Sequence, residues 1–415
     1  MQEGGRTHMS KEQKSASPEK MDLGEMSCTR RRLLKGCAYA AAGIALHQFA
    51  GGAQRVFGTE KRPLKNLANQ PSTVAIIKEK NHALVGESWK DPFNPFPGGE
   101  PPDKFWKPTW TKESEVKVEE MVRNSVAAAG DWSVEKGDIV AIQVNLVMSP
   151  LMNAQMGRLT DPELQSSVTD PRVARAVAIL AKESGAKEIY IVCNPMIANG
   201  YISFKQWGYE EVAKETGATL VGLSDVPYKY YPAPLELAYK QYALPTLMVD
   251  TANKVISVAS LKTHSLTGIT LALKNTGIGT PTGRVYGGPR LGLPHDKLAE
   301  VITDVCSIVG IDYAIIDGIW GMEGNGPLSG DPVAMDLIIA GRDPVAVDAI
   351  GTQIMGFDKE SIGTTRFAQA HGIGTYEGTK VKAIGEPFEK MIKQFAPVPK
   401  KFRFPGYCGQ VYGWD

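Results

Sequence analysis

The feature that most constrains the fold is an alternation of short apolar runs with helix-like segments along the chain. The runs are rich in Val and Ile, as buried strands are, and they lie at 73–77, 138–144, 188–193, 218–222, 255–259, 313–317 and 335–340. Helical segments are predicted at 170–184, 209–215, 296–309 and 343–355, two of them opened by an Asp-Pro pair. This pattern predicts an α/β fold, with a mostly parallel sheet covered by helices on both faces. We expect two lobes, joined between Asp225 and Ala252.

Composition excludes several classes of protein. Hydrophobic residues make up 43% of the 415 residues and charged residues 22%, as in soluble globular proteins. The formal net charge of +1 gives no indication of a nucleic-acid partner. The five cysteines contain no C-x-x-C spacing, so no cysteine-ligated iron–sulfur cluster is expected.

The N-terminal segment has the pattern of an export signal. Residues 29–35 carry three consecutive arginines before Leu-Leu-Lys, and an Ala- and Gly-rich stretch follows. This order resembles a twin-arginine signal. The apolar stretch has about 15 residues, too few to span a membrane, which needs roughly 20. We expect residues 1–53 to be a signal peptide with a polar extension, 54–72 a linker, and 73–415 the α/β body with an aromatic tail at 402–415. The expected location is the periplasm or another exported compartment, with the twin-arginine translocase as a partner during export and no permanent membrane span. A basic arm on a cytoplasmic protein is the alternative.

In such sheets, ligands bind beyond the carboxyl ends of the strands. The candidate ligand-binding loops are therefore those that follow Val144, Cys193, Ala259, Asp317 and Ala340. The segment after Ala259 combines cations, an imidazole, an amide and glycines, in the residues Lys262, His264, Lys274, Asn275, Gly277 and Gly279. Cationic side chains and backbone N–H groups exposed by glycine suit carboxylate or phosphate oxygens. His264 can act as an acid, a base or a metal ligand. The alternative is that the lysines are surface charges and His264 caps a turn.

The segment after the run 313–317 offers acids on a Gly-rich loop without the Gly-Lys-Ser/Thr of a P-loop. The candidate metal ligands are Asp317, Glu323 and Asp331, with Asn325 and Gly326 as ligand contacts between them. Hard oxygen ligands of this kind suit Mg²⁺, Mn²⁺ or Ca²⁺. Alternatively, the acids simply bond backbone N–H groups of a tight loop.

Four other residues have competing interpretations. Asp343 is explained as the N-cap before Pro344. Asp348 lies among apolar neighbours and therefore needs a partner or a raised pKa; it either lines the site or pairs with a lysine. Asn145 follows a strand and is a candidate ligand contact. Cys193 is best explained as a buried structural thiol.

Together these segments resemble the domain of unknown function 362 family. The matching motifs lie at 260–264, 270–275, 315–327 and 338–348, and the resemblance spans about 138–356. The family's first strand tends to end in Lys-x-Asn, whereas Gln143 stands in the lysine position here. Many relatives carry ferredoxin-like cysteine clusters, which this chain lacks. The resemblance implies that one site is formed by Lys262, His264, Lys274, Asn275, Asp317, Glu323 and Asp348. It implies no reaction.

These observations favour an exported enzyme whose cleft binds a small anionic ligand, with a divalent metal as a possible cofactor. In this hypothesis Lys262 and Lys274 neutralise the anion, His264 is an acid or base, and Asp348 relays protons or ligates the metal. The competing hypothesis is a non-catalytic binding or accessory protein, such as an assembly factor for an exported redox enzyme.

Overall fold

The computed structural model describes residues 66–87, 89, 107–196, 200–288 and 290–403. The predicted signal peptide, most of the predicted linker and most of the predicted aromatic tail lie outside these residues. The described residues form one compact unit. Within the described residues, no helix is both long enough and apolar enough to cross a membrane.

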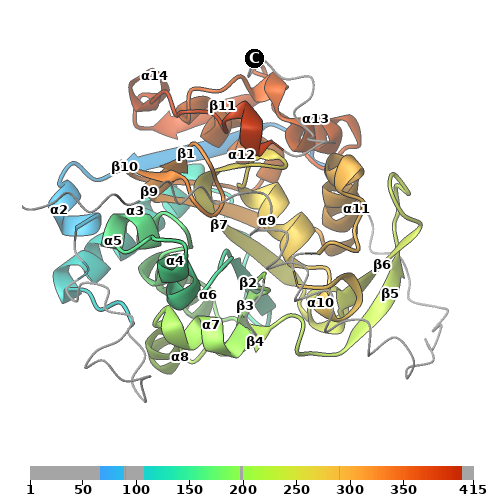
Figure 1. Ribbon diagram of the computed structural model, residues 1–415, viewed down its shortest axis with the longest axis horizontal. Helices are drawn as coiled ribbons and strands as arrows, with labels where there is room; N and C mark the ends of the chain where they lie inside the picture. Colours follow the sequence, from blue (N-terminus) through green and yellow to red (C-terminus); the bar gives the residue numbers. More distant parts are fainter. Residues whose placement is uncertain (1–65, 88, 90–106, 197–199, 289, 404–415) are drawn as a thin grey trace, which may run out of the picture. The chain divides into compact units, whose positions relative to one another are not determined.

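A mixed, mostly parallel sheet forms the centre of this unit (Figure 1). Its strands are β1 (Ser72–Lys78), β2 (Ile139–Val144), β3 (Glu188–Cys193), β4 (Thr219–Gly222), β7 (Lys254–His264), β8 (Gly268–Ile269), β9 (Tyr313–Glu323), β10 (Asp331–Gly341) and β11 (Val381–Gly385). The order is β11-β1-β10-β9-β7-β2-β3-β4, and β8 pairs with the end of β7. The strand β10 is antiparallel to β1 and β9, and β8 is antiparallel to β7, whereas the other neighbouring pairs are parallel.

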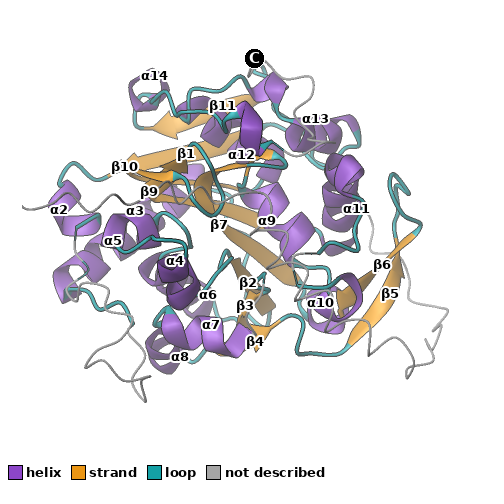
Figure 2. Cartoon of the chain, in the orientation of Figure 1, coloured by secondary structure: helices purple, strands orange, loops and turns teal. Residues whose placement is uncertain are grey.

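Helices cover both faces of the sheet, which confirms the predicted α/β class (Figure 2). One face carries α3 (Lys112–Ala129), α6 (Pro171–Glu183) and α8 (Tyr209–Thr216), and the other carries α9 (Ala272–Gly279), α11 (Leu298–Val309) and α12 (Pro344–Ile354). The shorter helices are α2 (His82–Val85), α4 (Pro150–Gln155), α5 (Asp161–Gln165), α7 (Gly200–Gln206), α10 (Gly283–Tyr286), α13 (Gly363–Ala370) and α14 (Phe388–Met391). Single turns of other helix types occur at Leu247–Thr251, His295–Lys297, Lys359–Ser361 and Lys400–Phe402.

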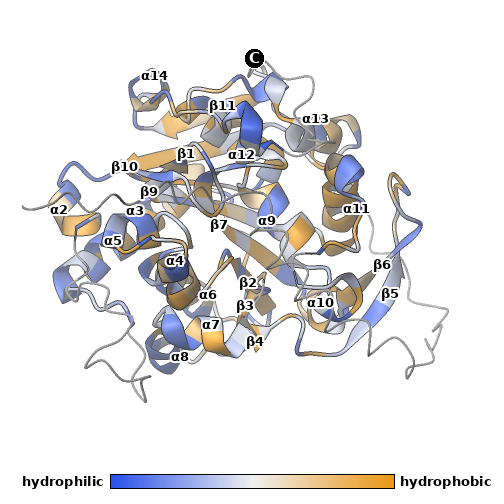
Figure 3. Ribbon diagram, in the orientation of Figure 1, coloured by the Kyte–Doolittle hydropathy of each residue, from blue (hydrophilic) through white to orange (hydrophobic). Residues whose placement is uncertain are grey.

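The two faces follow from the period of two along each strand. In β9, Ile315 packs toward α3 and α6, whereas Ala314 and Ile316 pack toward α12. Apolar residues accordingly dominate strands such as β10 and the buried helix α11 (Figure 3). Burial on both faces explains why the strands appear in the sequence as continuous apolar runs.

The structure differs from the sequence prediction in three respects. The strands β7, β9 and β10 continue well past the predicted runs, so much of the Gly-rich segment after Asp317 is strand rather than loop. Because β10 is antiparallel, the end of the run at Ala340 lies at the opposite edge of the sheet from the candidate site. The segment expected to join two lobes contains β5 (Tyr228–Pro232) and β6 (Gln241–Pro245), a separate two-stranded sheet within the same compact unit.

Candidate functional site

Lys262 lies near the end of β7 and is fully buried. Its Nζ donates hydrogen bonds to Asn145 Oδ1 and to the carbonyl of Ser167, both at 2.7 Å. Burial, and next the charge of Lys274, lower the pKa of Lys262 well below its usual value. Within the described residues Lys262 has no carboxylate partner, and its amine is held by neutral oxygens. It is a positioning residue rather than an accessible contact for a ligand.

Two asparagines connect this lysine to α9. Asn145 Nδ2 donates to Asn275 Oδ1 at 3.0 Å, and Asn275 Nδ2 donates to the carbonyl of Gln143 at 3.0 Å and to Ser257 Oγ at 3.1 Å. The Gln143 side chain also bonds the helix, donating to the carbonyl of Asn275 at 3.3 Å. Asn145 and Asn275 were predicted to contact a ligand, whereas their side chains fix the start of α9 against β2 and β7.

Lys274 lies in the first turn of α9 and is half-buried. Among the described residues its ammonium group has neither a hydrogen-bond partner nor an ion-pair partner. Burial, followed by the charge of Arg290, lowers its pKa to about 8. Leu271, just before the helix, has a φ of 31°, a strained value for a non-glycine residue. Lys274 is therefore a partly accessible cation on a firmly positioned helix.

Arg290 is a second cation without a carboxylate partner among the described residues. It is buried, has a φ of 60°, and donates only to backbone carbonyls, including Asn194 at 2.8 Å and Pro281 at 3.0 Å. Burial lowers its pKa to about 10. Because only neutral acceptors bind this buried guanidinium, no carboxylate offsets its positive charge, and that charge acts on neighbouring groups.

His264 ends β7 and is also buried. Its Nδ1 accepts a hydrogen bond from the backbone N–H of Leu266 at 3.0 Å. Burial and the neighbouring charges of Lys274, Lys262 and His295 lower its pKa well below 6.5, so the ring is neutral at pH 7. Because Nδ1 accepts, the single proton of the neutral ring lies on Nε2. At pH 7 His264 therefore offers a hydrogen-bond donor at Nε2, and its role as an acid or base stays a prediction.

Arg158 is a further buried cation, and it lies in the connection between α4 and α5. Its guanidinium donates to Glu163 O at 2.6 Å, to Ser166 Oγ at 3.2 Å and to the carbonyl of Gly330, and its charge acts on Lys262. We define the basic cluster as Arg158, Lys262, His264, Lys274 and Arg290. In the described part of the chain, none of its four cations forms a salt bridge with an Asp or Glu.

The three predicted metal ligands do not come together. Asp317 is buried opposite Ile338, and its carboxylate accepts the backbone N–H groups of Asp170 at 2.7 Å and Ile319 at 3.1 Å. Burial, and next the charge of Asp170, raise its pKa to about 7. Glu323 and Asp331 face each other at the far end of the β9–β10 hairpin. The alternative, acids that bond backbone N–H groups, describes Asp317.

The other two predicted metal ligands are also not arranged to bind a metal ion together. Glu323 accepts the N–H of Ala396 at 2.8 Å, and Asp331 is exposed. Across the described ranges, no group of three or more His, Cys, Asp or Glu side chains is arranged to hold a metal ion.

Asp348 supports α9 from the neighbouring helix α12. It is buried, and its two carboxylate oxygens accept the N–H groups of Ala272 at 2.8 Å and Leu273 at 3.0 Å. Burial raises its pKa to about 8. Among the described residues Asp348 forms no ion pair with a lysine; it caps the helix that carries Lys274. Asp343 is the predicted N-cap of α12.

The glycines that were expected to bind an anion serve packing instead. Gly277 and Gly279 lie inside α9, not in an open turn. A Cβ on Gly277 would lie 2.7 Å from the Cα of Ile302 on α11, and one on Gly279 would lie 2.7 Å from Gln143 Nε2. These glycines allow α9 to approach its neighbours closely.

The β9–β10 loop lies beside the end of β7. The carbonyl of Gly326 accepts the N–H of Ser265 at 2.9 Å, and a Cβ on Gly326 would lie 2.1 Å from the carbonyl of Thr263. The half-buried Asn325 precedes it. The structure therefore brings the two predicted segments together around His264, as the sequence analysis expected.

The basic cluster includes two arginines that the sequence did not predict, and the structure also shows the environment of Cys193. Arg158 and Arg290 were not predicted, although the glycines at 287, 288 and 292 around Arg290 mark an unusual loop. Cys193 is fully buried, and burial raises its pKa well above 9.0, so the structural interpretation is confirmed.

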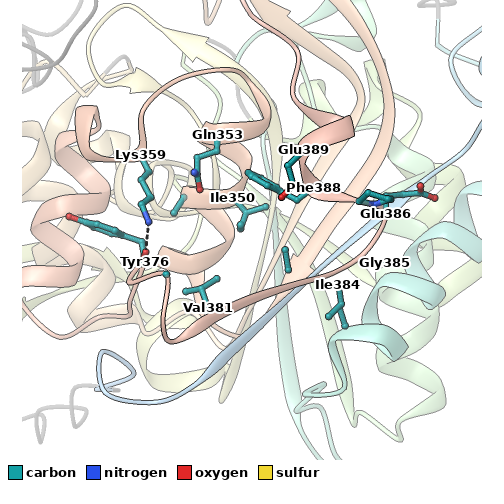
Figure 4. Close-up of a pocket in the computed structure, with 14 residues that line it drawn as sticks. Ile350, Gln353, Lys359, Tyr376, Val381, Ile384, Gly385, Glu386, Phe388 and Glu389 are labelled. Atoms are coloured by element: carbon teal, nitrogen blue, oxygen red, sulfur yellow. Dashed lines mark hydrogen bonds between the residues drawn. The ribbon is translucent and has the colours of Figure 1, made fainter.

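A pocket of about 490 Å³ lies elsewhere, between α12 and β11 (Figure 4). Ile350, Lys359, Tyr376, Val381 and Phe388 are among the residues that line it, and no member of the basic cluster does. Lys359 Nζ donates to the carbonyl of Tyr376 at 2.8 Å.

Comparison with known proteins shows similarity over the same region. Residues 152–353 match the family model described as domain of unknown function 362, and this range contains every member of the basic cluster. A thylakoid-associated protein of Synechocystis is 25% identical over 261 residues, which cover 62% of this chain and 76% of that protein. A crystal structure of a Thermotoga maritima protein aligns with a TM-score of 0.31 and 11% identity, over 62% of this chain and 59% of the other.

Proposed function

Since this chain belongs to the domain of unknown function 362 family, and the matched region holds the whole basic cluster, we propose that the cluster binds a small carboxylate or phosphate. The observation that carries the proposal is Lys274. It is a half-buried cation next to other cations, with no acidic partner among the described residues. Placing like charges together in a partly desolvated region is unfavourable, and a bound anion offsets that cost.

The hydrogen-bond geometry supports the same ligand class. Neutral His264 presents Nε2–H, a donor, and Lys274 presents an ammonium group. The first N–H groups of α9 are already bonded to Asp348, so the helix end itself does not hold the anion. The anion is therefore bound by side chains, and the nearby charge of Arg290 contributes positive potential.

The proposal does not include a metal. The acids expected to ligate one are at different positions along the β9–β10 hairpin, and Asp317 is engaged with backbone N–H groups. A small oxyanion needs only the donors already in the cluster.

A thermal-shift experiment tests the proposal. The protein is screened with inorganic phosphate and a series of small mono- and dicarboxylates, using wild type and Lys274→Met. Lys205→Met is the matched control, because Lys205 is an exposed lysine on α7. At about 100 times Kd, a ligand that binds only the folded state adds about 2.7 kcal/mol to the free energy of unfolding.

We expect at least one anion to raise the Tm of wild type and Lys205→Met, but not that of Lys274→Met. An equal response in all three proteins would contradict the proposal. Absence of any anion response, together with persistent co-purification of one protein partner, would favour a non-catalytic accessory role instead.

A further inference from the structure

We propose that Lys274 is a nucleophilic amine that forms an imine with the carbonyl carbon of a small 2-oxo carboxylate held by the basic cluster. This inference rests on the proposed anion site and deepens it. It assigns a reaction class and a substrate class to the same residues.

The first argument is the position of the amine. Lys262 is bound on two sides by Asn145 and Ser167, whereas Lys274 has no partner among the described residues. Lys274 is nevertheless well positioned, because Asp348 holds the N–H of the preceding Leu273. The following Asn275 is fixed by its hydrogen bonds to Asn145, Gln143 and Ser257. An uncommitted amine on a fixed backbone is a suitable arrangement for nucleophilic attack.

The second argument is the charge around the amine. Arg290 acts on Lys274 directly, and Lys274 in turn acts on Lys262 and His264. The nearby acids Asp317 and Asp348 are both bonded to backbone N–H groups. A lysine that is desolvated and close to other cations is an established kind of activated amine. With a pKa of about 8, about a tenth of the amine is unprotonated at pH 7.

The third argument is the match between donors and substrate. A 2-oxo carboxylate places an anionic group directly beside an electrophilic carbonyl carbon. The carboxylate would be held by the positive potential of Arg290, and the carbonyl oxygen would accept a hydrogen bond from His264 Nε2–H. Polarisation of the carbonyl by that donor favours attack by the amine.

The step balances without an oxidant or reductant. The Nζ lone pair forms a bond to the carbonyl carbon, and the oxygen takes up a proton to give a carbinolamine. The C–O bond then breaks and the oxygen leaves as water, carrying the two protons originally on the amine. The C=N bond of the imine remains, and protonation from solvent gives the iminium ion.

Borohydride trapping tests the inference. The protein is incubated with pyruvate as the probe, reduced with sodium borohydride, and analysed by intact mass and peptide mapping. Lys274→Arg keeps the positive charge but removes the primary amine, and Lys205→Arg is the control. Excess inorganic phosphate serves as a competitor.

We expect one adduct per chain, on Lys274, in wild type and Lys205→Arg, no adduct in Lys274→Arg, and less adduct with phosphate. If pyruvate raises the Tm of wild type but no adduct forms, or if adducts spread equally over several lysines, the imine is overturned and the anion site stands. If neither pyruvate nor phosphate raises the Tm, the proposed function itself fails.

Discussion

At the scale of single residues, burial assigns different roles to side chains of the same type. Lys262 is fully buried and holds Asn145 and Ser167, whereas Lys274 is half-buried and uncommitted among the described residues. Their positions in the sequence do not distinguish them. Local sequence identifies cations near a strand end, but the acceptors that bind one of them come from distant segments.

This difference predicts that the same substitution has effects of different size at the two lysines. Lys262→Met removes the donor to two buried acceptors, so we expect the free energy of unfolding to fall by about 2 kcal/mol. Lys274→Met removes no such bond, and we expect a change within about 0.5 kcal/mol. Urea denaturation of both variants measures this. Equal destabilisation would show that Lys274 has a structural partner.

Asp348 predicts a pH dependence of stability. Its pKa is raised to about 8 in the folded protein from 3.8, so the folded state binds the proton more tightly than the unfolded state. Its contribution to the free energy of unfolding is therefore complete below pH 4 and is lost as the pH rises from about 4 through 8. The free energy of unfolding falls by at most about 1.4 kcal/mol per pH unit in this range.

Asp348→Asn cannot titrate, so its stability should fall less than that of wild type between pH 5 and pH 8. Denaturant titrations at several pH values measure the two slopes. Parallel slopes would mean that the carboxyl is ionised in the fold across this range.

At the scale of elements, strand existence was predictable and strand length was not. The run 188–193 is β3 residue for residue, whereas β7 and β9 continue through polar and glycine-containing segments. Their extensions are set by pairing, such as Asp331 opposite Glu323 and Lys262 opposite Met322. Pairing between distant segments overrides local propensity. For the same reason the contributions of Arg158 and Arg290 were not predictable.

The close packing of α9 against α11 predicts that even a small added side chain lowers the stability of the protein. Gly277→Ala would place a Cβ 2.7 Å from the Cα of Ile302, so α9 and α11 must separate. We expect a loss of about 1–3 kcal/mol of stability and a weaker anion response. Gly378→Ala is the control, because its Cβ would meet nothing within 4 Å. If both variants unfold at the same urea concentration, the close approach of α9 to α11 is not essential.

At the scale of the whole molecule, the export signal proposed for residues 1–53 lies outside the described residues. The described residues all belong to one compact unit. We propose that the arginine pair directs export of the folded body through the twin-arginine pathway. This proposal concerns location and is independent of the anion site.

Changing both Arg30 and Arg31 to Lys should retain the protein in the cytoplasm, because the translocase recognises the arginine pair. Arg32→Lys alters the adjacent arginine and should leave export intact. Cell fractionation with immunodetection measures the distribution. Equal export of both variants would contradict a twin-arginine signal.

The central claim is that the basic cluster binds an anion through Lys274 and His264. A crystal structure of the protein with the anion that raises its Tm most tests this most directly. The account predicts the anion within hydrogen-bond distance of Lys274 Nζ and His264 Nε2. An anion bound only elsewhere, for example in the pocket beside Lys359, would contradict it.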